Sequence, residues 1–318
     1  MKLNKGLKTL SISLLCLFCL SGCVSLCLLD FALSPKNRGK DLEGSWKMMY
    51  HTYPHIQPWA DSLKQAEALK DTFILAPDGA RLHAYYAAAQ QKTSKTAVIV
   101  HGYTDNAIRM LMIGYLYHHD LGFNILLPDL RYSGQSDGDT FQMGWLDRLD
   151  VLRWMEVANQ TFGHDTQMVV HGISMGAATT MMVSGEPQKD YVKCFVEDCG
   201  YTSVWDEFAN ELRRMSGLPP FPILHLSSTF CKWTQGWSFK EASALNQVAK
   251  CPLPMLFIHG SNDDFVPTWM VHPLYEAKPE PKELWIVPDA QPQHARSYLH
   301  NREAYTQKVN QFIQKHIQ

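Results

Sequence analysis

The chain has 318 residues, of which 46% are hydrophobic and 19% are charged, and its formal net charge is −2. These values are ordinary for a folded protein with a sizeable core. A near-neutral chain without a basic stripe or an acidic tail offers no footprint for nucleic acid, so we expect no nucleic-acid partner. Length and composition indicate an enzyme-sized globular domain, and the reaction has to be sought in motifs.

The first 33 residues have the pattern of a membrane-directing segment. Lys2, Lys5 and Lys8 form a positively charged start, and residues 9–29 contain no charged side chain. A helix needs about 20 apolar residues to cross the hydrocarbon core of a bilayer. Lysines on the N-terminal side hold that end in the cytoplasm, so we expect a membrane anchor with the rest of the chain on the extracytoplasmic face.

Two interpretations of this segment remain open. Leu20-Ser21-Gly22-Cys23 resembles a bacterial lipobox, in which Cys23 would be lipidated and would become the mature N-terminus. Residues 10–20 would then be the short apolar region of a lipoprotein signal. Alternatively, the segment is an uncleaved signal anchor that reaches residue 29 or 33.

Residues 34–71 read as a tether followed by one surface helix at 59–70. Residues 72–318 form the main domain, in which short apolar runs alternate with helical stretches. This alternation predicts a mostly parallel sheet of eight strands flanked by helices. The expected strands are 72–76, 81–88, 97–100, 124–127, 168–170, 194–196, 255–258 and 284–287, and the expected helices are 106–119, 144–160, 175–184, 268–277 and 301–316.

Two departures from simple alternation add detail. Residues 72–88 read as a hairpin with Pro77-Asp78-Gly79 at its turn, which predicts an antiparallel strand at one side of the sheet. Residues 201–250 are rich in Trp, Phe, Leu and Pro and show no strand pattern. We expect this insertion to form a helical cap over the carboxyl ends of the strands, where such folds bind ligands.

Gly172-Ile173-Ser174-Met175-Gly176 follows a predicted strand and opens a predicted helix. Such a tight strand-to-helix turn requires residues almost without side chains two positions before and two after the serine. It places the serine on an exposed corner at a helix N-terminus. Ser174 is therefore the predicted nucleophile.

A serine hydroxyl needs a general base, and the base needs an orienting acid. His294 lies after the last predicted strand and before the final helix, where this base belongs, whereas His300 is expected to face solvent. The favoured acid is Asp263, in the loop after the seventh strand. Asp264 and Asp198 are the alternatives.

The oxyanion of the reaction intermediate requires backbone N–H donors. One donor is expected from Met175, which follows the nucleophile, and the other from Tyr103 in the loop after the third strand.

These motifs, in this order, resemble the α/β-hydrolase superfamily over residues 72–316. The resemblance includes His101-Gly-Tyr-Thr104 and Pro128-Asp-Leu-Arg-Tyr-Ser-Gly-Gln-Ser-Asp-Gly138. Three further segments resemble a bacterial group of membrane-anchored or secreted hydrolases, often with no assigned substrate. They are Gly144-Trp-Leu-Asp-Arg-Leu-Asp150, Glu197-Asp-Cys-Gly-Tyr-Thr-Ser203 and Ala290-Gln-Pro-Gln-His294. Tyr132-Ser133 departs from the usual Gly-His of the second motif. The resemblance implies an α/β-hydrolase fold and an esterase-type reaction on a small-molecule ester.

The expected function is therefore an extracytoplasmic carboxylesterase with a Ser-His-Asp triad. The alternatives are a small serine peptidase of the prolyl-oligopeptidase type and a binding lipoprotein on the same fold in which the triad is not assembled. No cofactor is expected, because no phosphate-binding, dinucleotide-binding or zinc-protease motif occurs, and the oligomeric state is left open. Four cysteines outside the N-terminal segment could form disulfides or remain buried thiols, namely Cys194, Cys199, Cys231 and Cys251.

Overall fold

The computed structural model of the chain describes residues 5–35, 39–288, 291 and 293–318, with side chains from residue 19 onward. Eight strands form one sheet in the spatial order β1-β2-β4-β3-β5-β6-β7-β8. All neighbouring pairs are parallel except that β2 is antiparallel to both β1 and β4. The strands are β1 (Lys70–Leu75), β2 (Arg81–Ala87), β3 (Lys95–Val100), β4 (Asn124–Pro128), β5 (Gln167–Ile173), β6 (Val192–Asp198), β7 (Met255–Gly260) and β8 (Lys282–Val287).

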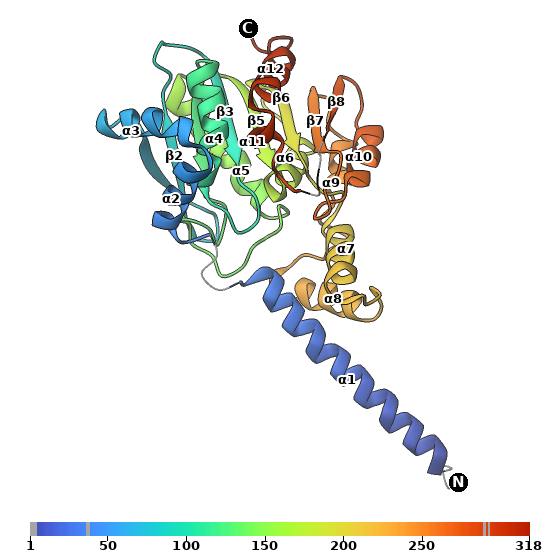
Figure 1. Cartoon of the computed structure of the whole chain (residues 1–318). Coiled ribbons are helices and arrows are strands. Elements are labelled where there is room, and N and C mark those ends of the chain that lie inside the picture. Colours follow the sequence, from blue (N-terminus) through green and yellow to red (C-terminus); the bar gives the residue numbers. More distant parts are fainter. Residues whose placement is uncertain (1–4, 36–38, 289–290, 292) are drawn as a thin grey trace.

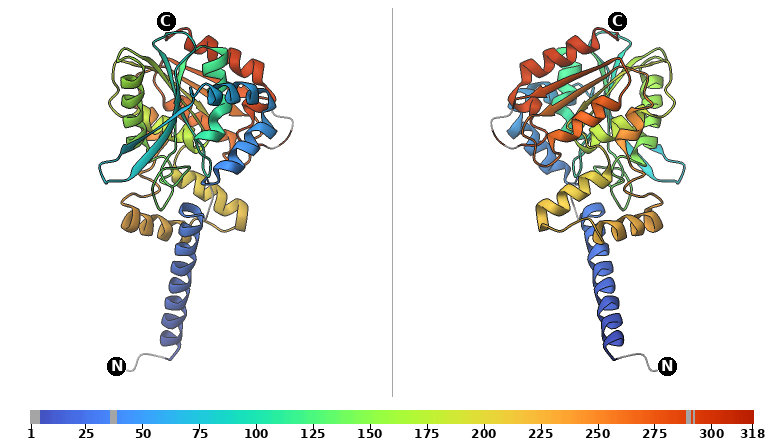
Figure 2. Two further views of the ribbon diagram at one scale, coloured as in Figure 1. Left: turned by 90° about the vertical axis from the view of Figure 1, so that its left-hand side faces the viewer. Right: turned by 90° about the vertical axis from the view of Figure 1, so that its right-hand side faces the viewer.

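Helices cover both faces of this sheet (Figures 1 and 2). One face carries α2 (Leu42–Thr52), α3 (Gln57–Gln65), α4 (Leu111–Tyr115) and α12 (Arg302–Ile313). The other carries α5 (Asp147–Phe162), α6 (Met175–Ser184), α9 (Ala244–Val248) and α10 (Val271–Ala277). The remaining helical elements are α1 (Lys5–Leu33), η1 (Pro54–Ile56), η2 (Ala107–Met110), η3 (Leu116–Asp120), α7 (Val204–Ser216), α8 (Ile223–Gln235), η4 (Thr268–Met270) and α11 (Ser297–His300).

The central strands are buried along almost their whole length. Every residue of β4 and of β7 is buried, with no alternation between core and solvent. Continuous apolar runs are typical of strands that are covered on both faces. The predicted fold class, an α/β-hydrolase fold with a mostly parallel eight-stranded sheet, is confirmed.

The segment before β1 is more ordered than the tether that the sequence predicts. Asp41 caps α2, since its Oδ1 accepts a hydrogen bond from the backbone N–H of Gly44 at 2.8 Å. In α3, Trp59 and Leu63 are buried, and Trp59 Nε1 donates to Nδ1 of His118 at 3.1 Å. The two apolar side chains are one helical turn apart and reach the core between polar neighbours. Residues 42–65 are thus part of the domain.

The predicted cap is present as α7 and α8 (Figure 1). Ser203 begins α7, and its Oγ accepts a hydrogen bond from the N–H of Asp206 at 3.1 Å, a cap worth about 1 kcal/mol. Ser203 and Ser243 form an antiparallel bridge that joins the two ends of the insertion. The third helix of this stretch, α9, packs against α6 on the sheet, so the cap is shorter than residues 201–250.

The N-terminal helix α1 extends away from the domain beside the cap (Figures 1 and 2). Its C-terminal part packs against α8. Ser25 Oγ donates to the carbonyl oxygen of Ile223 at 2.9 Å, and Ser227 Oγ donates to the carbonyl oxygen of Ser25 at 3.0 Å. Within the described part of the chain, no helix combines the length and the apolar character needed to cross a membrane.

Candidate active site

Ser174 lies at the sharp turn between β5 and α6. Its backbone has φ 58° and ψ −121°, a conformation that residues other than glycine rarely adopt. A Cβ atom at Gly172 would overlap the carbonyl oxygen of Gly176, and one at Gly176 would overlap the carbonyl oxygen of Val100. The turn therefore needs glycine on both sides of the serine, as the motif predicts.

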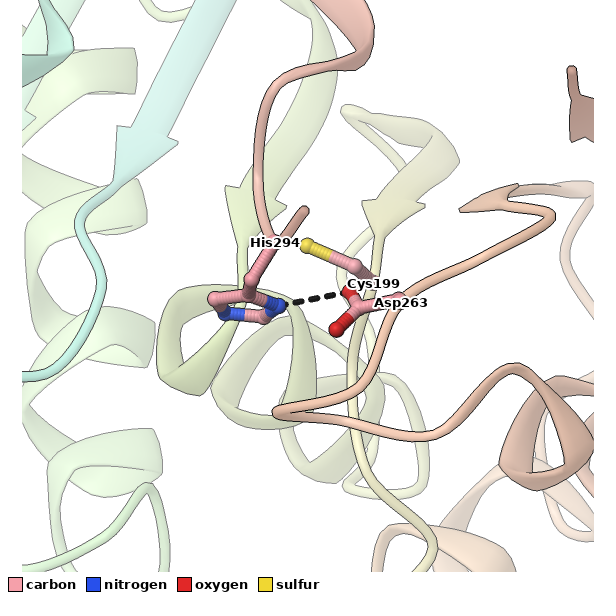
Figure 3. Close-up of side chains that lie close together, drawn as sticks. All are labelled: Cys199, Asp263 and His294. Carbon is pink, nitrogen blue, oxygen red and sulfur yellow. Dashed lines mark hydrogen bonds and ion pairs between the residues drawn. The ribbon is translucent and has the colours of Figure 1, made fainter. Parts of the chain in front are cut away.

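The imidazole of His294 lies between Ser174 and Asp263. Its Nε2 is 2.7 Å from Oγ of Ser174, and its Nδ1 is 2.6 Å from Oδ2 of Asp263. Figure 3 shows the second of these contacts. When Nδ1 donates its proton to the carboxylate, Nε2 is left to accept the serine proton. The structure thus brings the three predicted side chains together in the order that base-assisted nucleophilic attack requires.

Asp263 is fixed in its loop by two backbone groups. The N–H groups of Phe265 and Val266 both donate to its Oδ1 at 3.0 Å. His259 Nε2 donates to the carbonyl oxygen of Val266 at 2.9 Å, which holds the far side of the same loop. Oδ2 of Asp263 is consequently directed at His294.

The alternative residues have other positions. Asp264 is exposed, and so is His300 at the end of α11. Asp198, at the end of β6, accepts a hydrogen bond from the hydroxyl of Tyr305 at 3.0 Å, and burial raises its pKa to about 7. Asp263, rather than Asp198 or Asp264, is therefore the carboxylate bonded to His294.

The two expected oxyanion donors, Tyr103 and Met175, both line the pocket that contains Ser174. Met175 is the first residue of α6, where the helix dipole favours negative charge. The hydroxyl of Tyr103 donates to the carbonyl oxygen of Ala32 at 2.6 Å. Tyr103 thereby connects the loop after β3 to α1, a contact that no motif indicates.

The motif at residues 128–138 supports the loop after β3 through hydrogen bonds. His101 Nδ1 donates to the carbonyl oxygen of Gly102 at 2.7 Å, and its Nε2 accepts from the N–H of Leu130 at 2.9 Å. Oδ1 of Asp129 accepts a hydrogen bond from the N–H of Ala107 at 2.7 Å, and Oδ2 of Asp129 is 2.7 Å from Nδ1 of His83. These bonds give the motif a structural role, which is to fix the backbone next to Ser174.

A pocket of about 870 Å³ opens beside the triad. Its walls come from the catalytic loops, from the cap and from the C-terminal part of α1. Most wall residues from α1 and the cap are apolar, among them Val24, Leu28, Leu29, Phe208, Leu212 and Leu224. A concave, mainly apolar pocket with few polar groups is typical of a site for a small organic molecule.

The aromatic residues of the cap have mixed roles. Phe208 lines the pocket, whereas Trp237 is fully buried and its Nε1 donates to Gln142 at 2.9 Å. Phe221 and Trp233 are 72% and 75% exposed. Aromatic composition alone therefore does not identify the pocket wall.

Glu207 is a pocket residue that the sequence reasoning missed. It lies on α7, its side chain is 3% exposed, and neither carboxylate oxygen has a hydrogen-bond partner in the described structure. Burial raises the pKa of this carboxyl well above its usual range. A signal existed, since Glu207 is three residues after Val204 and falls on the stripe of α7 that packs inward.

Cys199 lies beside the triad (Figure 3). Among the described residues, its sulfur, Asp263 and His294 place metal-ligand atoms within 4.8 Å of one another. Burial raises the pKa of the Cys199 thiol well above its usual value, and metals bind the thiolate. Asp263 and His294 are moreover bonded to each other. Cys199, Asp263 and His294 are therefore better explained as part of a catalytic triad with a neutral thiol beside it than as the ligands of a metal ion.

Comparison with known proteins places this geometry in a wider context. Residues 116–318 match the sequence profile described as the prolyl oligopeptidase family. The uncharacterized protein YqkD of Bacillus subtilis is 32% identical over 255 residues, which cover 80% of this chain and 82% of YqkD.

Solved structures share the fold. The Pyrococcus furiosus esterase Pf2001 superposes with a TM-score of 0.63 at 24% identity, covering 80% of this chain and 95% of the esterase. An acylaminoacyl peptidase superposes with a TM-score of 0.58 at 16% identity, covering 78% of this chain and 41% of the peptidase. At these identities the likeness shows the common architecture.

Proposed function

This chain belongs to the prolyl oligopeptidase family of hydrolases, and we propose that it is a serine esterase. In this proposal Ser174 is the nucleophile and a small-molecule carboxylic ester is the substrate. The hydrogen-bonded series Ser174–His294–Asp263, which opens onto an apolar pocket, is the observation that carries the proposal.

Each member of the series has one task. His294 accepts the proton of Ser174 as Oγ attacks the acyl carbon, and then passes it to the leaving alcohol. Water next attacks the acyl-enzyme with His294 again as base, and the carboxylic acid leaves. Asp263 holds the imidazole in place and stabilises its charged form. The reaction consumes one ester and one water and forms one acid and one alcohol.

The backbone N–H groups of Met175 and Tyr103 are proposed to stabilise the oxyanion. Both residues line the pocket next to Ser174, and Met175 stands at the positive end of the α6 dipole. The loss of one such donor typically costs about 2.7–4 kcal/mol of transition-state stabilisation.

An ester is favoured over a peptide because the walls next to Ser174 are mainly apolar. The fold match also covers 95% of the Pyrococcus esterase but only 41% of the acylaminoacyl peptidase. A small serine peptidase is the second candidate, and the name of the matched family is the observation that favours it.

The test compares p-nitrophenyl butanoate with aminoacyl p-nitroanilides, using the full chain and its Ser174→Ala variant. We expect ester hydrolysis that S174A abolishes and at least a hundredfold lower kcat/KM for every anilide. Faster cleavage of an anilide than of the ester would replace the esterase proposal by the peptidase.

A fluorophosphonate probe separates both enzymes from a binding protein. An assembled triad labels Ser174, and S174A or His294→Gln removes the label. Folded protein that takes up no probe would support the binding lipoprotein.

We further propose that the N-terminal segment attaches the enzyme to the extracytoplasmic face of a membrane. The uncharged run at residues 9–29 behind three lysines supports this location. The lipoprotein and the signal anchor both fit the packing of α1, because the first residue of α1 that lines the pocket is Val24, directly after Cys23, and the hydrogen bonds to α8 and Tyr103 come from Ser25 and Ala32. Removal of residues 1–22 would leave these contacts in place.

A further inference from the structure

The C-terminal part of α1 is a wall of the active-site pocket. Val24, Leu28, Leu29, Phe31 and Ala32 line the same cavity as Ser174 and His294. This wall is held by the hydrogen bonds of Ser25 to α8 and of Tyr103 to Ala32. The segment expected to lie in or at the bilayer therefore also forms part of the pocket that contains Ser174.

Exposed apolar side chains surround the place where α1 leaves the domain. They belong to α1, to the end of α7, to the loop between α7 and α8, and to α8 itself, and Figures 1 and 2 show these elements at the same end of the molecule. They are Leu20, Leu26, Phe31, Met215, Leu218, Phe221 and Trp233, which are between 40% and 75% exposed. Apolar groups gathered on one end of a protein mark a contact surface.

We propose that the pocket binds the acyl chain of an amphiphilic ester that enters from the bilayer along α1. This substrate class rests on the proposed esterase function. The carbonyl lies at Ser174 and the chain lies against the apolar walls of α1, α7 and α8. The bilayer is the source because either form of the N-terminus, a lipidated Cys23 or a signal anchor, holds the pocket wall at the membrane surface.

Chain length is the first measurable consequence. Each methylene group transferred from water to an apolar wall strengthens binding about fourfold. Leu28 is half-buried and lines the pocket, whereas Leu26 is 48% exposed and faces away from it. These two leucines of one helix form a matched pair.

The experiment measures kcat/KM of the full chain for p-nitrophenyl dodecanoate and p-nitrophenyl butanoate below their micellar concentrations. We expect the dodecanoate to butanoate ratio to exceed ten, to fall at least tenfold in Leu28→Gln and to change less than twofold in Leu26→Gln. A ratio near one, or equal ratios in the two variants, would overturn the proposal. Absence of activity on both esters would instead refute the proposed esterase.

Contact with the bilayer is measured by tryptophan quenching. The full chain is reconstituted in vesicles of brominated phosphatidylcholine, and the loss of emission relative to unbrominated lipid is recorded. Trp233 lies on α8, and Trp269, which is 53% exposed, lies in η4 outside the cap. We expect Trp233→Phe to remove at least half of the quenching and Trp269→Phe to leave it unchanged. Equal quenching in both variants would exclude the bilayer contact.

Glu207 carries a second and independent inference. An unpaired buried carboxyl is costly to maintain in the folded state, and this one lies in the wall of the reaction pocket. We infer that Glu207 hydrogen-bonds a hydroxyl group of the ester substrate. The ester would then combine an apolar chain with a hydroxyl-bearing part.

Two esters that differ only in the two free hydroxyls of the alcohol part test this inference, namely glycerol monododecanoate and propyl dodecanoate. The wild-type chain should prefer the glycerol ester in kcat/KM. This preference should fall at least tenfold in Glu207→Leu and be largely retained in Glu207→Gln, whose amide still hydrogen-bonds. The proposed role is wrong if E207L and E207Q shift the preference equally, or if the wild-type chain does not distinguish the two esters.

Discussion

At the scale of single residues, position matters more than residue type. Asp263 and Asp264 are neighbours with the same side chain, yet one accepts two backbone N–H groups and contacts His294 while the other faces solvent. The sequence favours Asp263 over its neighbour because of its position in the pattern His259-Gly-x-x-Asp263-x-x-Val-Pro267. Glu207 escaped the same reasoning, since its burial in the pocket wall depends on how the cap packs in the tertiary structure.

The two neighbouring aspartates provide a direct test of the triad. Asp263→Asn leaves the shape of the site intact but favours the wrong tautomer of His294. We expect kcat for ester hydrolysis to fall on the order of 10⁴-fold. Asp264→Asn should change kcat less than twofold. If D264N or Asp198→Asn caused the large loss and D263N did not, the assignment of the acid would be wrong.

Asp147 provides a prediction about stability and pH. Its side chain is buried at the start of α5, Oδ2 accepts from the N–H of Gly144 at 2.9 Å, and burial raises its pKa to about 7. The folded chain binds this proton more tightly than the unfolded chain. The contribution is therefore complete below about pH 4 and is lost as the pH rises through 7, a change of about 4 kcal/mol at most.

Urea unfolding at pH 5 and at pH 8 measures this effect. An asparagine cannot ionise, so Asp147→Asn should lose less stability between the two pH values than the wild-type chain loses. The exposed Asp165 supplies the control, since D165N should follow the wild-type chain. A D147N variant with the full wild-type decline would show that Asp147 ionises as readily in the folded state as in the unfolded chain.

At the scale of elements, the local sequence pattern was sufficient to predict the strands of the sheet. It was insufficient to predict how the helices of the N-terminal region pack. All eight strands overlap the predicted runs, and β4 and β7 do so because a strand buried on both faces needs only an apolar run. Helix α2 was not predicted, and the surface helix predicted at 59–70 overlaps α3, whose polar residues obscure the few side chains, such as Trp59, that reach the core. The packing of α1 against α8 depends on contacts about 200 residues apart in the chain, as in the bond from Ser227 to Ser25.

The sharp turn between β5 and α6, which carries Ser174, is the element in which backbone geometry most tightly limits the choice of residues. In Gly176→Ala the new methyl group would overlap the carbonyl oxygens of Val100 and His101, so the turn cannot form without a shift of β3. We expect a loss of more than about 4 kcal/mol in stability together with loss of activity. The matched control is Gly114→Ala in α4, where the methyl group meets Ile125 at 3.4 Å, an ordinary contact.

Thermal unfolding and ester hydrolysis measured together check this prediction. G114A should unfold within a few degrees of the wild-type chain and remain active. A G176A protein that is both stable and active would show that the glycine is dispensable.

At the scale of the whole molecule, the structure favours buried thiols over disulfides. Cys194, Cys199, Cys231 and Cys251 are all buried and unpaired in the described structure. Burial raises the pKa of Cys194 well above its usual value and that of Cys231 to about 12, so both thiols are poor nucleophiles. We expect iodoacetamide to label none of the four in the native chain and all four after unfolding without reductant, as counted by mass spectrometry. Fewer than four labels after unfolding would reveal a disulfide.

The position of the molecule in the cell depends on Cys23, which lies inside a continuous helix between the lysine-flanked start and the pocket wall. Both interpretations of this segment predict that the chain remains in the membrane fraction after an alkaline carbonate wash and is digested by protease added to spheroplasts. They differ in Cys23→Ala. A lipoprotein would lose its covalent lipid and keep residues 1–22, seen as a mass change, whereas a signal anchor would be unaffected. Because the pocket wall begins at Val24, activity toward a soluble butanoyl ester should survive C23A in either case. A chain that carbonate releases, or that protease cannot reach in spheroplasts, would refute the extracytoplasmic anchor and with it the route of substrate along α1.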